Sequence, residues 1–218
     1  MFRQRLDKSV AFWSPDRRHR LQVEKQFCQT FAMMLSHLAI PVALLMAIAL
    51  AKGEATIKAT SMITPDCKRV FSYKVYGKVE MVQKASGGET TITVKLWGFQ
   101  PNTVHGFHIH DKGDIHSRGC LSTGGHYNPF GVNHGAKDDI IRHVGDLGNV
   151  KADSNGEVRL TFEDKMVSLV GKYSVAGRAF VVHAMQDDLG RGEGSQRAGS
   201  LKTGNAGARV ACGIIYYS

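Results

Sequence analysis

Residues 153–163 read DSNGEVRLTFE and carry the clearest structural signal in this chain. Val158, Leu160 and Phe162 alternate with polar residues, so a strand over these positions would have one apolar face and one polar face. Asn155-Gly156 precedes this alternation, and the dipeptide favours the tight turn of a β-hairpin. The stretch therefore predicts a turn followed by a half-buried β-strand.

Short apolar runs of strand length recur before and after this stretch. We expect strands at 55–63, 70–82, 90–97, 106–110, 178–183 and 209–217. Twenty-four glycines fit a fold made of turns, and no period of three to four residues indicates a substantial helix beyond residue 52. Many short strands predict an all-β sandwich or barrel.

Two long stretches lack strand character, and they contain most of the polar chemistry of the chain. They cover residues 111–149, rich in glycine, histidine and aspartate, and residues 187–208, rich in glycine, arginine and serine. Loops this long inside a compact domain are usually functional. Seven of the ten histidines fall between His105 and His143, where an even scatter would leave about two, so we expect a metal site there.

The histidines form two candidate ligand sets. His108 and His110 are two residues apart in Gly-Phe-His-Ile-His, so strand alternation places both imidazoles on one face, where one metal can bind both. A second set follows in a glycine-rich stretch and offers three imidazoles and one carboxylate, which suits zinc. Its members are His126, His134, His143 and Asp146.

His183 ends the apolar run 179–182. Taken alone, a histidine in that setting is more often a hydrogen-bonded core residue than a ligand, but the neighbouring cluster favours a ligand. A set made only of imidazoles, without thiolates, suits copper in both of its oxidation states. The alternative for the whole cluster is one structural zinc with the remaining histidines solvated.

The first 51 residues differ from the rest of the chain. A basic region runs into the apolar segment 31–51, an order typical of an export signal, and Ala49-Leu50-Ala51 fits a cleavage site before Lys52. We therefore divide the chain into a leader, 1–51, and a globular domain, 52–218. The apolar segment is nearly long enough to span a membrane, so an uncleaved signal-anchor is the alternative. A translation start near Met33 also stays open.

The net charge and the cysteines limit which partners the chain can have and in which cellular compartment it works. The net charge of +9 is not gathered into a run and no aromatic-basic pattern accompanies it, so we expect no nucleic-acid partner. Of four cysteines, Cys28 would leave with the leader. Three would remain in an oxidising compartment, which leaves one thiol without a partner.

Four motifs together resemble the copper/zinc superoxide dismutases, and the resemblance spans nearly all of residues 55–215. The order of the motifs and the intervals between them make the match specific. It implies an eight-stranded Greek-key β-barrel or sandwich of immunoglobulin-like architecture, in an extracellular-type member of the family. The motifs are Gly106-Phe107-His108-Ile109-His110, Gly125-His126-Tyr127-Asn128-Pro129, Arg142-His143-Val144-Gly145-Asp146-Leu147-Gly148-Asn149 and Gly204-Asn205-Ala206-Gly207.

The resemblance implies one copper and one zinc per subunit, with His126 as an imidazolate between them. Asp187 would accept hydrogen bonds from the copper ligand His108 and the zinc ligand His134, which fixes both rings. The implied copper ligands are His108, His110, His126 and His183. The implied zinc ligands are His126, His134, His143 and Asp146.

The resemblance also implies a disulfide and a catalytic cycle. A bond between Cys120 and Cys212 would close a loop of about ninety residues and could stabilise the fold by up to roughly 4–5 kcal/mol. In the implied cycle the copper alternates between Cu(II) and Cu(I), and two superoxide anions with two protons become oxygen and hydrogen peroxide. His126 would store a proton, with zinc as its fixed support. Arg209 would draw the anion to the copper, with Lys202, Arg191 and Arg197 as further candidates.

The implied role is an exported antioxidant oxidoreductase, attached to a membrane only if the leader is retained. We expect a homodimer and, as a further candidate partner, a copper-loading chaperone.

Three features depart from the family pattern: Tyr216, the lengthened segment 114–120, and an insertion at 64–74 with Cys67. The first two bear on the dimer contact. A copper carrier without turnover and a zinc hydrolase are competing classes. The implied bridge and Arg209 disfavour the carrier, and the lack of a carboxylate base beside an open zinc position disfavours the hydrolase.

Overall fold

The computed structural model describes residues 54–218, so the expected leader, its cleavage site and Cys28 lie outside the described residues. The described part is an all-β domain in which eight strands form a nearly closed antiparallel barrel, as the sequence predicts. The strands are β1 (Thr56–Pro65), β2 (Tyr76–Lys84), β3 (Thr90–Trp97), β4 (Val104–His110), β5 (Asp146–Lys151), β6 (Glu157–Asp164), β7 (Ala179–His183) and β8 (Arg209–Ile214), with a two-residue β9 (Tyr216–Tyr217) beside β1.

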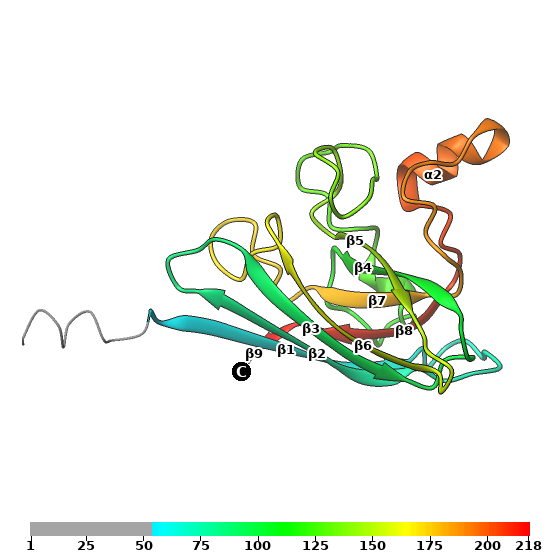
Figure 1. Ribbon diagram of the computed structural model, residues 1–218, viewed down its shortest axis with the longest axis horizontal. Helices are drawn as coiled ribbons and strands as arrows, with labels where there is room; N and C mark the ends of the chain where they lie inside the picture. The colour runs from blue at the N-terminus through cyan, green and yellow to red at the C-terminus, as the bar shows by residue number, and fades with distance from the viewer. Residues whose placement is uncertain (1–53) are drawn as a thin grey trace, which may run out of the picture. The chain divides into compact units, whose positions relative to one another are not determined.

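The order of strands around the barrel is β5-β4-β7-β8-β1-β2-β3-β6, and every pairing is antiparallel (Figure 1). Neighbours that are distant in sequence, such as β3 with β6 and β4 with β7, require the long connections of a Greek key. β1 joins the two halves of the barrel, because its first eight residues pair with β2 while Thr64 and Pro65 pair with β8.

The core lies between the two halves and follows from strand alternation. Val79 and Met81 of β2 face inward beside Ile92 and Val94 of β3, and all four side chains are fully buried. Strand β4 is buried over almost its whole length, unlike a strand with one solvated face. Its Phe107 belongs to the apolar core, so the intervening histidines of β4 are available to a second buried region.

The turn at 153–156 forms as predicted, but the hairpin predicted from it is wrong. Gly156 has φ +75° and donates a hydrogen bond to the carbonyl of Asp153, which closes the turn. The flanking strands β5 and β6 do not pair with each other: β5 pairs with β4, and β6 pairs with β3 along its whole length. The tight turn therefore carries the chain from one half of the barrel to the other.

Two further strand predictions need correction. The strand expected at 70–82 begins only at Tyr76, because residues 66–75 form an irregular excursion between β1 and β2. Residues 146–149, expected to lie in a loop, form the first part of β5. Of the described residues, only short segments are helical: η1 (Leu121–Thr123), η2 (Gly194–Gln196) and α2 (Arg197–Thr203). None of the helices between residues 54 and 218 is both long enough and apolar enough to cross a membrane.

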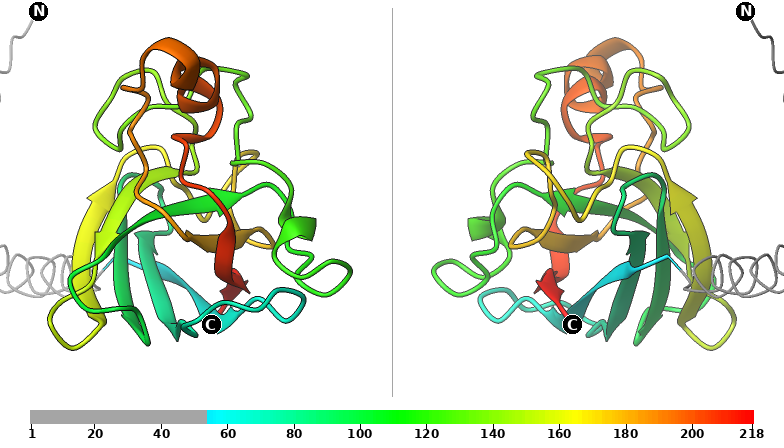
Figure 2. Two further views of the ribbon diagram at one scale, coloured as in Figure 1. Left: turned by 90° about the vertical axis from the view of Figure 1, so that its right-hand side faces the viewer. Right: turned by 90° about the vertical axis from the view of Figure 1, so that its left-hand side faces the viewer.

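Much of two long loops lies on one side of the barrel, at the top of both views in Figure 2. We call residues 111–145 the histidine loop and residues 184–208 the closing loop, which contains α2. The two loops are in direct contact: the His134 amide donates to the Leu201 carbonyl at 2.8 Å, and Arg191 binds both carboxylate oxygens of Asp139 at 2.8 Å. These contacts hold the closing loop against the histidine loop.

Candidate metal centre

Two buried groups of metal-ligating side chains lie side by side and share one member, His126. In each group the candidate ligand atoms lie within 4.8 Å of one another. The first group is His108, His110, His126 and His183, and the second is His126, His134, His143 and Asp146. The fold thus brings together every residue proposed as a ligand from the sequence, from β4, the histidine loop, β5 and β7.

The second group is arranged around one carboxylate oxygen. Asp146 Oδ1 lies 2.8 Å from His126 Nδ1, 3.0 Å from His134 Nδ1 and 3.0 Å from His143 Nδ1. Ligand atoms around a tetrahedral zinc with bonds near 2.0 Å are about 3.3 Å apart, close to these separations. His134 Nδ1 is buried and makes no hydrogen bond, although Asp146 is near. Three nitrogens and one oxygen in this arrangement fit zinc.

Asp146 is held as a carboxylate. Burial opposes its ionisation, but the three imidazoles around its carboxylate outweigh burial and hold the pKa of Asp146 well below its usual range. A buried anionic oxygen that faces three nitrogen donors is a ready ligand for a hard or borderline cation.

The first group offers only imidazole nitrogens. His110 Nε2 lies 3.2 Å from His183 Nε2, and His108 Nδ1 and His126 Nε2 are buried without any hydrogen-bond partner. Buried polar atoms without a partner are costly and rare, so two in one group indicate a site suited to a cation. Four imidazoles fit copper.

The rings of the first group are prepared to bind a cation at neutral pH. Burial, followed by the neighbouring His126, lowers the pKa of His108 and of His110 far below its usual value, and lowers the pKa of His183 to about 3. These rings are therefore neutral. The second nitrogen of His110 bonds to the Gly124 carbonyl at 2.9 Å and that of His183 to the Gly207 carbonyl at 3.2 Å, which fixes the nitrogen left for a metal.

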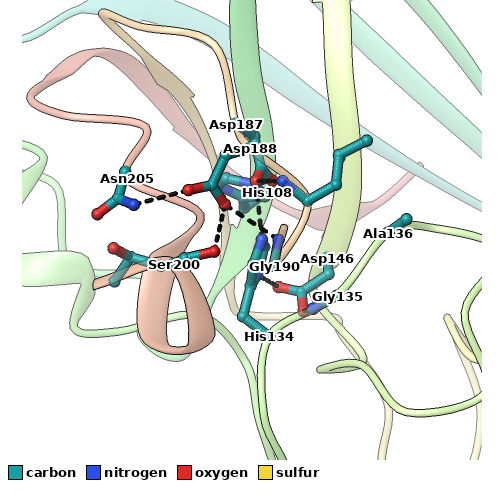
Figure 3. Close-up of polar contacts among 12 residues, drawn as sticks. His108, His134, Gly135, Ala136, Asp146, Asp187, Asp188, Gly190, Ser200 and Asn205 are labelled. Carbon is teal, nitrogen blue, oxygen red and sulfur yellow. Dashed lines mark hydrogen bonds and ion pairs between the residues drawn. The ribbon is translucent and has the colours of Figure 1, made fainter. Parts of the chain in front are cut away.

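Asp187 connects the two groups through the ring nitrogens of His108 and His134 that are not the candidate ligand atoms (Figure 3). Its Oδ2 lies 2.7 Å from His108 Nε2 and its Oδ1 lies 2.8 Å from His134 Nε2, and the side chain is fully buried. The backbone of Asp187 is fixed by Asn149, which exchanges two hydrogen bonds with it. One carboxylate therefore orients one ring from each group.

An open hollow of about 490 Å³ borders the centre. His126, His143, Lys202 and Thr203 contribute to its lining. Arg191 and Arg197 do not line it: Arg191 is bound to Asp139, and Arg197 donates to the carbonyl of Gly190. Of the cations proposed from the sequence, Lys202 therefore lies beside this hollow.

Arg209 is anchored at the disulfide. Its Nη1 donates to the carbonyls of Cys120 and Leu121, at 2.8 and 3.2 Å, and to Thr123 Oγ1 at 3.1 Å. Cys120 is bonded to Cys212, while Cys67 is free and exposed. The histidine loop is thus cross-linked to β8 at the position where the guanidinium is held.

Sequence reasoning missed several residues around the centre. Asp188, Ser200 and Asn205 form a hydrogen-bonded cluster inside the closing loop, which strand periodicity cannot reveal. His105, which belongs to neither ligand group, lies in β4 and bonds to the His183 carbonyl at 2.8 Å. Its position on the opposite face from the ligands is consistent with a structural role. His116, which also belongs to neither group, is exposed.

Comparison with known proteins gives a consistent answer. Residues 75–215 match the family model described as copper/zinc superoxide dismutase. The chain is 50% identical over 141 residues to a copper-zinc superoxide dismutase of Onchocerca volvulus, which covers 65% of this chain and 88% of that protein. It is 50% identical over 141 residues to one of Saccharomyces cerevisiae, with 65% and 89% covered. It is 43% identical over 175 residues to one of Paramecium bursaria Chlorella virus 1, with 80% and 89% covered.

Proposed function

This chain belongs to the copper/zinc superoxide dismutase family, and on that premise we propose how its own residues carry out superoxide dismutation. The enzyme is an oxidoreductase that converts two superoxide anions and two protons into oxygen and hydrogen peroxide, with copper and zinc as cofactors. The first ligand group would hold the copper and the second would hold the zinc. When bound, the copper supplies one-electron exchange with superoxide, and the zinc supplies a fixed positive charge beside His126.

One observation carries this assignment: the two nitrogens of His126 face different groups. Nδ1 lies 2.8 Å from Asp146, whereas Nε2 is buried on the other side without a partner. His126 would therefore be the one ligand common to the copper group and the zinc group. His126 Nε2 is also the atom that can take up a proton in one half of the cycle and release it to the product in the other, because no other group of the described chain competes for it.

The remaining residues orient the ligand rings or attract the superoxide anion. Asp187 holds His108 and His134 in the tautomers that leave their other nitrogens for metal. Lys202, beside the hollow, and Arg209, held on the carbonyls of the histidine loop, attract the small anion toward the centre. Attraction by exposed charges acts over about 8 Å at physiological salt, so only such nearby cations contribute strongly.

The test is selective metal removal. The protein loaded with copper and zinc should dismute superoxide, and removal of copper alone should abolish the rate while the fold persists. Removal of zinc alone should leave the dismutation rate of the copper-containing protein unchanged. It should change the copper spectrum, because His126 belongs to both ligand groups. A rate unaffected by copper loss would overturn the mechanism, and a metal-loaded protein that binds copper without turnover would be a carrier.

We also propose that the enzyme is exported. The support is the order of a basic region and an apolar segment at 31–51, followed by Ala49-Leu50-Ala51. The alternative is an anchored form with an uncleaved leader. N-terminal sequencing of the protein from its natural compartment distinguishes the two, since a start at Lys52 supports a released enzyme and an intact leader supports an anchor.

We further propose a homodimer that uses the surface around β1 and β9. Met62, Tyr216 and Tyr217, from these two paired strands, are each about half exposed, and exposed large apolar residues near one another mark contact surfaces. Light scattering on the metal-loaded protein tests this, and Tyr217→Lys should shift a dimer toward the monomer.

A copper-loading chaperone is a second proposed partner. Its test is whether copper delivery from a protein donor outpaces uptake from free copper.

A further inference from the structure

Asp188 directly follows Asp187, yet its carboxylate faces away from the metal ligands and into the closing loop (Figure 3). Its Oδ1 accepts from Ser200 Oγ at 2.7 Å and from the Gly190 amide at 3.0 Å. Its Oδ2 accepts from Asn205 Nδ2 at 2.6 Å. One carboxylate thereby ties together three points of a loop that spans 17 residues between Asp188 and Asn205.

The contacts of Ser200 extend this cluster across the loop. Ser200 is fully buried in α2, and its hydroxyl also accepts a hydrogen bond from the Gly192 amide at 2.8 Å. The amide of Asp188 donates to the carbonyl of Gly204, which follows α2, at 2.8 Å. Asp188 is thus hydrogen-bonded both to the middle of α2, at Ser200, and to the residue that follows the helix, Gly204.

Lys202 depends on this arrangement. It lies in the last turn of the seven-residue α2, two residues from Ser200, and lines the hollow beside His126. A helix this short does not hold its shape in water by itself, so contacts with the surrounding chain must fix it. Charge-assisted hydrogen bonds to a carboxylate are among the stronger contacts available for this purpose.

We propose that Asp188 is a positioning residue for superoxide attraction: it fixes the closing loop so that the Lys202 ammonium stands at the hollow above His126. The inference rests on the proposed function, because Lys202 matters only if an anion is drawn to this centre. It gives the two adjacent aspartates separate tasks. Asp187 orients metal ligands, and Asp188 orients a cation that never touches the metals.

The test is a double-mutant cycle on the enzyme loaded with copper and zinc, with rates expressed per bound copper at low ionic strength. A unit charge about 10 Å from the reacting anion in water changes the local anion concentration about twofold. Lys202→Gln should therefore lower the rate about twofold in the wild-type background and leave it unchanged in the Asp188→Asn background, where the lysine is already displaced.

Asp138→Asn is the matched control, since it removes the same charge from an exposed carboxylate whose only side-chain partner among residues 54–218 is the adjacent Lys137. In this background Lys202→Gln should keep its twofold effect. In 1 M salt, where screening acts over about 3 Å, the difference between the backgrounds should disappear, which a purely structural defect would not do.

An equal effect of Lys202→Gln in all three backgrounds would overturn the proposal. If Asp188→Asn fails to fold or to retain both metals, Ser200→Ala takes its place in the same cycle, because it deletes only the hydroxyl between Asp188 and the Gly192 amide. Failure of the proposed function itself would look different, since the metal-loaded wild type would then show no dismutation.

Discussion

The guanidinium of Arg209 donates a 2.8 Å hydrogen bond to the carbonyl oxygen of Cys120, whose sulfur is bonded to that of Cys212, three residues from Arg209 in the chain. The cross-link and the cation therefore act on the same short segment of the histidine loop. The disulfide fixes the carbonyls, and the carbonyls fix the direction of the guanidinium. Loss of the disulfide should therefore change the position of the Arg209 guanidinium.

Replacement of both bonded cysteines, Cys120→Ser with Cys212→Ser, should lower stability and activity together. The closed loop spans 92 residues, so the free energy of unfolding should fall by up to about 5 kcal/mol. The rate per bound copper should also fall, as Arg209 loses its fixed acceptors. Calorimetry and a dismutation assay measure the two effects. Cys67→Ser, at an exposed free thiol, is the control and should change neither. A wild-type rate without the disulfide would show that Arg209 holds its place unaided.

Arg209→Lys keeps the charge and removes the planar fork. The guanidinium nitrogen Nη1 contacts three acceptors, an arrangement that a single ammonium on a flexible stem does not reproduce. We expect the rate at low salt to fall on the order of threefold, with a weaker dependence on ionic strength. Arg159→Lys, on the exposed face of β6, serves as the control and should keep the wild-type salt profile. Identical profiles for the two variants would mean that charge alone matters at Arg209.

Asp187→Asn should weaken metal binding while leaving every ligand in place. The amide offers a donor where His108 or His134 now meets a carboxylate oxygen, so one of the two rings loses its orientation. Loss of such an orienting partner typically costs 10- to 100-fold in metal affinity. Competition with a chelator measures the affinities of zinc and copper separately. Unchanged affinities for both metals would show that the rings are held by packing instead.

Gly204→Ala tests how tightly the closing loop sits on the centre. Gly204 has φ +66°, and a Cβ there would collide with the Asp187 carboxylate and come within 2.6 Å of His134 Nε2. Gly171 provides a matched control, because it has φ +75° with nothing within 4 Å of its Cβ. Both alanine variants should lose about 1 kcal/mol from backbone strain, and only Gly204→Ala should also lose zinc. Thermal unfolding and metal analysis of the two proteins give the comparison. Full zinc occupancy in Gly204→Ala would mean that the loop can move off the site.

The sequence predicts those parts of the fold and the centre that depend on a local period or on a match of motifs. Strand alternation correctly places His108 and His110 together, because the side-chain period of a strand is two whatever its partners are. The strand at 90–97 is predicted to the residue for the same reason. The pairing of β6 with β3 is not predictable from its turn, since a turn sequence fixes the local bend but not which strand lies beside it.

Residues that act through long-range contacts escaped prediction. Asp188, Ser200 and Asn205 are ordinary loop residues in sequence, and only the folded loop brings their side chains together. β5 was missed because glycine and aspartate interrupt its apolar pattern, while its place beside β4 is decided by the tertiary fold. In each case the information lies in a partner far away along the chain.

The shared ring of His126 makes the two cofactor affinities interdependent. An ion that binds at Nδ1 fixes the plane in which Nε2 is presented, so part of the entropy of ordering the ring is already lost when the second ion arrives. Thermodynamic linkage requires the benefit to be mutual: whatever factor zinc adds to the affinity for copper, copper adds to the affinity for zinc. Partial supply of both ions should therefore yield a mixture richer in fully loaded and empty molecules than independent binding would give.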